Sequence, residues 1–158
     1  MIQGWHHTSF TVSNLEESER FFVEVMGMKR IGGGLYDFDY LRRHVGYLEA
    51  VLNIAVLSFP GSGPNEHLLE LIEYIQPAGR PADTAANRPG NAHLCFLVSD
   101  IDAEVRRLKA AGLAFRCQTP NEVTWGINKG AKVIYFHGPD DIVLELYQPA
   151  QATAEASP

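Results

Sequence analysis

The stretch AHLCFLVSDID at residues 92–102 decides the fold, because it repeats an earlier stretch, HHTSFTVSNLE at residues 6–16. An offset of 86 residues superposes His7 on His93, and a phenylalanine, a valine and a serine also coincide. Alternating apolar residues followed by a helix-capping residue are typical of a strand that runs into a helix. Each copy therefore predicts a strand with a histidine near its start, followed by a helix.

A second repeat lies later in each half. The tripeptide Leu-Glu-Leu occurs at residues 69–71 and again at 144–146, each time within an apolar run typical of a strand. Successive side chains on a strand point to opposite faces, so Glu70 and Glu145 are expected opposite their flanking leucines. A carboxylate within an apolar strand costs free energy unless it is paired, hydrogen-bonded or bound to a metal. Each half thus offers one histidine and one glutamate.

The remaining pattern predicts the order β-α-β-β-β in each half and an α+β fold class. Ser13 and Ser99 are expected to cap the two helices, because each is followed three residues later by an acidic residue. The glycines at 32–34 are interpreted as a flexible turn, and residues 114–117 as a short strand.

Proline and glycine are frequent between residues 77 and 90, which is typical of a linker. The sequence therefore predicts a single domain over residues 1–149. It comprises one module at 4–76, a linker at 77–90 and a second module at 91–149. The small and polar residues 150–158 are expected to form a frayed tail.

Composition excludes several classes of protein. With a net charge of −6 and scattered basic residues, nucleic acid is not expected as a partner. No apolar run approaches the ~20 residues of a membrane span, and the N-terminus lacks the pattern of a signal peptide. We expect a cytoplasmic protein, in which Cys95 is a small core residue.

The two histidines and two glutamates suit a metal ion. Imidazole nitrogens and carboxylates bind Ni²⁺, Co²⁺, Fe²⁺, Mn²⁺ and Zn²⁺, and four such ligands on an octahedral ion leave two positions for substrate. A lone histidine or glutamate on a strand is more often structural or solvent-facing. The register with an internal repeat favours His7, Glu70, His93 and Glu145 as ligands of one divalent ion. His44 and His137 share no such register.

With these motifs the chain resembles the vicinal oxygen chelate superfamily, which includes glyoxalase I, methylmalonyl-CoA epimerase, extradiol dioxygenases, and the bleomycin and fosfomycin resistance proteins. The similarity covers about residues 4–149. It implies two tandem βαβββ modules that form a U-shaped half-barrel around the metal, with the same four ligands. Extradiol dioxygenases do not use the position of Glu70 as a ligand, and the epimerases typically carry glutamine there. Glu70 therefore makes the chain most similar to glyoxalase I.

The resemblance implies a metal-dependent lyase or isomerase, similar to lactoylglutathione lyase (glyoxalase I) or to acyl-CoA epimerases. Its small-molecule substrate has vicinal oxygens or an enolisable carbonyl, and the metal stabilises an enediolate or enolate. Glu145, with Glu70 as partner, carries the proton. It further implies a homodimer, with modules paired within a chain or across chains.

Two alternatives stay open. The first is an Fe²⁺ extradiol-type ring-cleavage dioxygenase that uses His7, His93 and Glu145. The second is a metal-free protein that sequesters a small molecule or drug, which fits poorly with two glutamates in apolar strands.

Overall fold

The computed structural model describes residues 1–63 and 67–151. The chain divides into two compact units, Met1–Ala82 and Asp83–Pro158, and the boundary falls within the expected linker at 77–90. The expected tail lies outside the described residues from position 152 onward. No helix in the described parts of the chain is long and apolar enough to cross a membrane.

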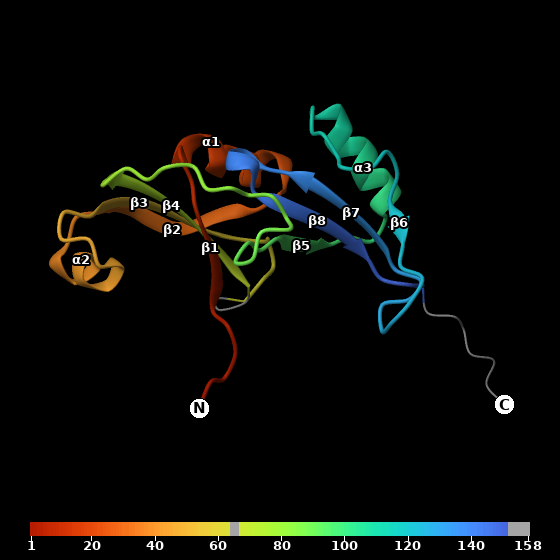
Figure 1. Ribbon diagram of the computed structural model, residues 1–158, viewed down its shortest axis with the longest axis horizontal. Coiled ribbons are helices and arrows are strands. Elements are labelled where there is room, and N and C mark those ends of the chain that lie inside the picture. Colours follow the sequence, from red (N-terminus) through yellow and green to blue (C-terminus); the bar gives the residue numbers. More distant parts are fainter. Residues whose placement is uncertain (64–66, 152–158) are drawn as a thin grey trace. The chain divides into compact units, whose positions relative to one another are not determined.

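The first unit contains one four-stranded sheet and the helices that follow its strands (Figure 1). Its elements are β1 (His7–Thr11), α1 (Leu15–Arg20), a π-helical turn η1 (Phe21–Val25), β2 (Lys29–Tyr36), α2 (Asp39–Val45), β3 (Val51–Ser58) and β4 (Leu68–Gln76). The strand order is β1-β4-β3-β2. Strand β1 runs parallel to β4, while the two other pairings are antiparallel.

The second unit repeats this plan with shorter strands. Its elements are β5 (Leu94–Leu97), α3 (Ile101–Ala110), β6 (Asn121–Glu122), β7 (Lys132–His137), a 3-10 turn η2 (Pro139–Asp141) and β8 (Val143–Gln148). The order β5-β8-β7-β6 matches that of the first sheet, and β5 is parallel to β8. The predicted α+β class and the β-α-β-β-β order of each half are therefore confirmed.

Each sheet buries the face that its helix covers. Helix α1 packs on β3 and β4, and α3 packs on β8. The leucines that flank the two glutamates are fully buried or nearly so: Leu69, Leu71, Leu144 and Leu146. Because neighbouring residues on a strand point to opposite faces, Glu70 and Glu145 lie on the faces away from the helices, as predicted.

The helix caps lie one residue later than predicted. Asn14 and Asp100, rather than Ser13 and Ser99, are the N-caps, because they have extended backbone conformations immediately before the first helical residue. The Asn14 side chain accepts a hydrogen bond from the Glu17 N–H at 3.1 Å. That of Asp100 accepts one from the Ala103 N–H at 2.9 Å.

A second side chain supports each helix start, and the two occupy equivalent positions. Glu73 lies three residues after Glu70 on β4 and accepts a hydrogen bond from the Leu15 N–H at 3.3 Å. Gln148 lies three residues after Glu145 on β8 and accepts one from the Ile101 N–H at 2.7 Å. These contacts tie the start of each helix to the strand that carries the glutamate.

One turn prediction and one strand prediction were wrong. The glycines at 32–34 do not form a turn but belong to β2, where a Cβ on Gly33 would lie 2.1 Å from the Ile54 carbonyl oxygen. Glycine is needed there for close approach of two backbones. Residues 114–117 form no strand, only an isolated bridge between Phe115 and Phe136, and the short strand of this half is β6.

Candidate metal centre

The first histidine and glutamate meet through the parallel pairing of β1 with β4. In this register Ser9 lies opposite Glu70, and His7, two residues before Ser9, points to the same face. The His7 Nε2 atom lies 3.4 Å from Glu70 Oε2. The apolar run of β4 holds this strand between β1 and β3, so the sheet itself positions the glutamate.

The second pair forms in the same way. His93 immediately precedes β5, and the parallel register places Cys95 opposite Glu145 of β8. The His93 Nε2 atom lies 3.1 Å from Glu145 Oε2. Each unit therefore brings together the histidine and the glutamate that the sequence predicted for it.

The spacing within each pair fits two ligands of one ion. Donor atoms about 2.1 Å from an ion lie ~3.0 Å apart at an octahedral right angle and ~3.4 Å apart at a tetrahedral angle. The separations of 3.4 Å and 3.1 Å agree with these values. Among the described residues, no group of three or more His, Cys, Asp or Glu side chains gathers into a metal cluster.

Tyr135 on β7 is a site neighbour that the sequence did not reveal. It lies opposite Glu145 in the β7–β8 register, and its hydroxyl is 3.4 Å from His93 Nε2. The Tyr135 and His93 rings meet edge to face, with centroids 5.1 Å apart. Burial raises the pKa of the Tyr135 hydroxyl, and the negative charge of Glu145 raises it further. Finding Tyr135 from sequence needs the register of the β7–β8 hairpin, which periodicity does not supply.

Cys95 is not the core residue that the sequence predicted, since its side chain is exposed on the face that carries Glu145. Phe96, its neighbour in β5, takes the buried face instead. Partial burial, the charge of Glu145 and a hydrogen bond to that carboxylate raise the pKa of the Cys95 thiol to about 12. The thiol therefore stays protonated at neutral pH and is not an activated nucleophile.

The first pair has simpler surroundings. Glu70 lies between Ser9 on β1 and Val56 on β3, which occupy the positions of Cys95 and Tyr135. The His7 Nδ1 atom lies 2.9 Å from Nδ1 of the exposed His6. No aromatic hydroxyl corresponds to that of Tyr135, because valine stands in its place.

Comparison with known proteins identifies the scaffold. A family model described as the Glyoxalase/Bleomycin resistance protein/Dioxygenase superfamily matches residues 6–135. The chain belongs to this superfamily. The resemblance inferred from the His and Leu-Glu-Leu motifs is thereby confirmed.

Three proteins similar to this chain have different names and reported functions. The chain is 32% identical to a 2-epi-5-epi-valiolone epimerase from Actinomyces sp., over 95% of this chain and 82% of the epimerase. The crystal structure of a glyoxalase family protein from Bacillus cereus matches with a TM-score of 0.78 at 23% identity, over 96% of this chain and 97% of that one. A fosfomycin resistance protein from Listeria monocytogenes, crystallised with Mn(II), matches with a TM-score of 0.57 at 17% identity, over 95% of both chains.

Proposed function

We propose that this glyoxalase-superfamily chain is a metal-dependent lyase or isomerase that moves a proton next to a carbonyl group. Two histidine–glutamate pairs at equivalent sheet positions, each spaced as neighbouring metal ligands, carry this proposal. The 32% identity to an epimerase supports proton transfer as the reaction type. His7, Glu70, His93 and Glu145 are the proposed ligands of one divalent ion, whether one chain or two copies of it supply both pairs.

The two glutamates have different proposed roles in proton transfer. A divalent ion held by His7, Glu70, His93 and Glu145 would supply Lewis-acid polarisation of a substrate oxygen next to the reacting carbon. Glu145 takes the proton from carbon, because it is the less exposed glutamate and lies opposite Tyr135 on the neighbouring strand. An epimerase must return a proton to the other face of the carbon, and Glu70 is the second carboxylate available for that step.

Metal content tests the ligand set. The purified protein and its Glu70→Ala and Glu145→Ala variants are stripped with a chelator, reloaded with Ni²⁺, Co²⁺, Fe²⁺, Mn²⁺ or Zn²⁺, and assayed by plasma mass spectrometry. We expect near-stoichiometric metal in the parent and less in both variants. Glu49→Ala, which removes an exposed glutamate from the first unit, is the matched control and should bind as the parent does.

Hydrogen exchange tests the reaction. Substrates are incubated with the loaded enzyme in D₂O, and loss of the proton next to the carbonyl is followed by NMR. The panel includes 2-epi-5-epi-valiolone, hemithioacetals and acyl-CoA thioesters. Exchange on any of these substrates supports the proposal. Oxygen uptake with a catechol, together with iron binding that is unchanged in the Glu70→Ala variant, would instead indicate ring cleavage. Tight ligand binding without metal and without exchange indicates a sequestering protein.

The expected homodimer is also a proposal. In this superfamily, modules pair within a chain or across chains, so the two His–Glu pairs of one site can come from two copies. Mixing a His7→Ala/Glu70→Ala variant with a His93→Ala/Glu145→Ala variant tests this. Restored metal binding in the mixture would show pairing across chains, and no restoration would show pairing within one chain.

A further inference from the structure

We propose that Arg116, held in position by His137, binds an oxyanion of the substrate, a carboxylate or a phosphoryl group, beside the His93–Glu145 pair. This inference rests on the proposed function and specifies its substrate class. Neither residue belongs to the internal repeat, so the sequence alone does not single out Arg116 or His137.

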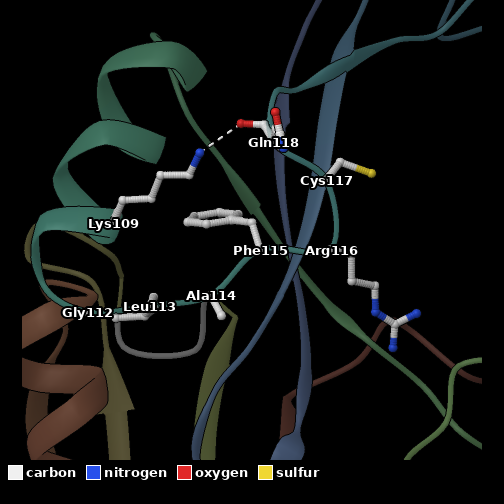
Figure 2. A pocket seen from close by; sticks show the side chains of 8 residues that line it. All are labelled: Lys109, Gly112, Leu113, Ala114, Phe115, Arg116, Cys117 and Gln118. Atoms are coloured by element: carbon white, nitrogen blue, oxygen red, sulfur yellow. Dashed lines mark hydrogen bonds between the residues drawn. The ribbon is translucent and has the colours of Figure 1, made fainter.

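Arg116 projects from the segment between α3 and β6. Its backbone N–H donates a hydrogen bond to the Tyr135 carbonyl at 3.0 Å, which fixes this segment beside β7. Figure 2 shows Phe115 and Arg116 leaving the segment in opposite directions, with Phe115 directed toward Lys109 and Arg116 away from it. The Arg116 side chain therefore points away from the contact between Lys109 and Phe115.

His137 orients the guanidinium. Its Nδ1 atom lies 3.2 Å from the Asp141 carbonyl oxygen, which only accepts hydrogen bonds, so Nδ1 carries the proton. In the neutral ring Nε2 is then an acceptor, and it takes the Nε–H of Arg116 at 3.2 Å. This contact uses the Nε–H and leaves the N–H groups on both Nη atoms for a ligand. Two Nη groups in one plane match the two oxygens of a carboxylate or phosphoryl group.

The guanidinium lies near the candidate metal ligands within the same unit. The Arg116 Cζ atom is 5.9 Å from the centroid of the Tyr135 ring, and the hydroxyl of that ring lies 3.4 Å from His93 Nε2. Tyr135 thus connects the arginine to the His93–Glu145 pair. One small molecule can place an oxygen at that pair and an anionic group at Arg116.

The charge of Arg116 is also uncompensated. In the part of the chain that the structure describes, no carboxylate lies within ion-pair distance of Arg116. Four other arginines contact one: Arg30, Arg42, Arg88 and Arg107. The chain carries a net charge of −6, so carboxylates are plentiful. An arginine that is oriented by a histidine and lacks a carboxylate partner is suited to an external anion.

Anion binding to the metal-free protein tests this inference. The probes are inorganic phosphate and acetate, titrated separately into chelator-treated protein. Calorimetry gives the affinity, and NMR follows the Arg116 Nε–H and His137 ring signals. We expect saturable binding that shifts both signals, and at least a tenfold loss of affinity in Arg116→Gln, since a charge-assisted contact is lost. Arg106→Gln removes the same charge from an exposed position on α3 and should change affinity less than twofold.

Each outcome decides a different question. Stronger binding of phosphate points to a phosphoryl substrate, and stronger binding of acetate to a carboxylate. Arg116→Lys should bind less tightly than the parent but more tightly than Arg116→Gln, because it keeps the charge and loses the planar pair of donors. Absence of saturable binding, or equal losses in Arg116→Gln and Arg106→Gln, overturns the inference.

This test is independent of the proposed function, because it uses no metal and no turnover. Arg116-dependent anion binding without proton exchange on any substrate would leave the anion site standing and remove the reaction. Exchange that proceeds equally with neutral and anionic substrates, and that is unaffected by Arg116→Gln, would support the proposed reaction and reject the anion site.

Discussion

The His7–Glu70 and His93–Glu145 pairs occupy the same register in two sheets of the same strand order, yet their neighbours differ. Glu70 lies between Ser9 and Val56, whereas Glu145 lies between Cys95 and Tyr135. The Glu145 side chain is 13% exposed and that of Glu70 is 23% exposed. The repeated backbone therefore places the two His–Glu pairs in the same way, and the residues on the two adjacent strands give each pair different surroundings.

This difference predicts unequal roles for the two glutamates. Glu145→Gln should lower the exchange rate in D₂O by ~10³-fold, because a positioned general base contributes about 10²- to 10⁴-fold. Glu70→Gln should lower the exchange rate less, by about tenfold with hemithioacetal substrates, because the His7–Glu70 pair has no counterpart of the Tyr135 hydroxyl. Both variants are assayed after metal loading, with metal content measured in parallel. Equal losses would show that the two pairs are functionally equivalent.

The outer strands extend the comparison to stability. Strand β2 has eight residues and passes close to β3 at Gly33, whereas β6 has two residues. Gly33→Ala should cost about 2–4 kcal/mol in the free energy of unfolding, because it combines a steric clash with strain at φ 105°. Urea unfolding measures the cost. Gly32→Ala is the matched control, since its Cβ would meet only the Val56 Cβ at 3.9 Å.

Removing the hydroxyl of Tyr135 should make the second pair behave more like the first. Tyr135→Phe is expected to lower kcat about tenfold with little change in KM or metal content, since it removes one hydrogen bond near His93. Tyr74→Phe on β4 is a control that removes a hydroxyl from the first unit. A normal rate in Tyr135→Phe would show that the hydroxyl does not assist the reaction.

The smallest effect concerns the helix starts. Helix α1 begins with the amide of Asn14 and the carboxylate of Glu73, whereas α3 begins with the carboxylate of Asp100 and the amide of Gln148. Glu73→Gln should destabilise the protein by about 0.3–1 kcal/mol, because a negative charge leaves the helix N-terminus. Adding Asn14→Asp should restore most of this loss. Thermal unfolding of the single and double variants at low salt measures both changes.

The sequence predicts the superfamily from its motifs and the order of elements from apolar alternation, and its internal repeat singles out one histidine and one glutamate in each half. Sequence-based prediction fails where a residue's environment depends on the close approach of two backbones or on the pairing of strands distant in sequence. A turn is predicted at Gly33 because the neighbouring sequence contains no sign of the close approach of Ile54. Cys95 is predicted to be a core residue because its exposure depends on the β5–β8 register, which the sequence does not show. Tyr135 and Arg116 cannot be identified from sequence for the same reason, because their positions depend on the β7–β8 hairpin and on the segment beside it.

The helix starts also bear on how the two halves have diverged. Each start has one carboxylate and one amide, but the carboxylate is on the cap in one half and on the last strand in the other. If the halves descend from one duplicated ancestor, the single carboxylate at each helix start has changed position by substitution, while the number of carboxylates at each start has stayed at one. Substitutions at these positions are then coupled, and a chimera that joins the helix start of one half to the last strand of the other acquires two charges or none.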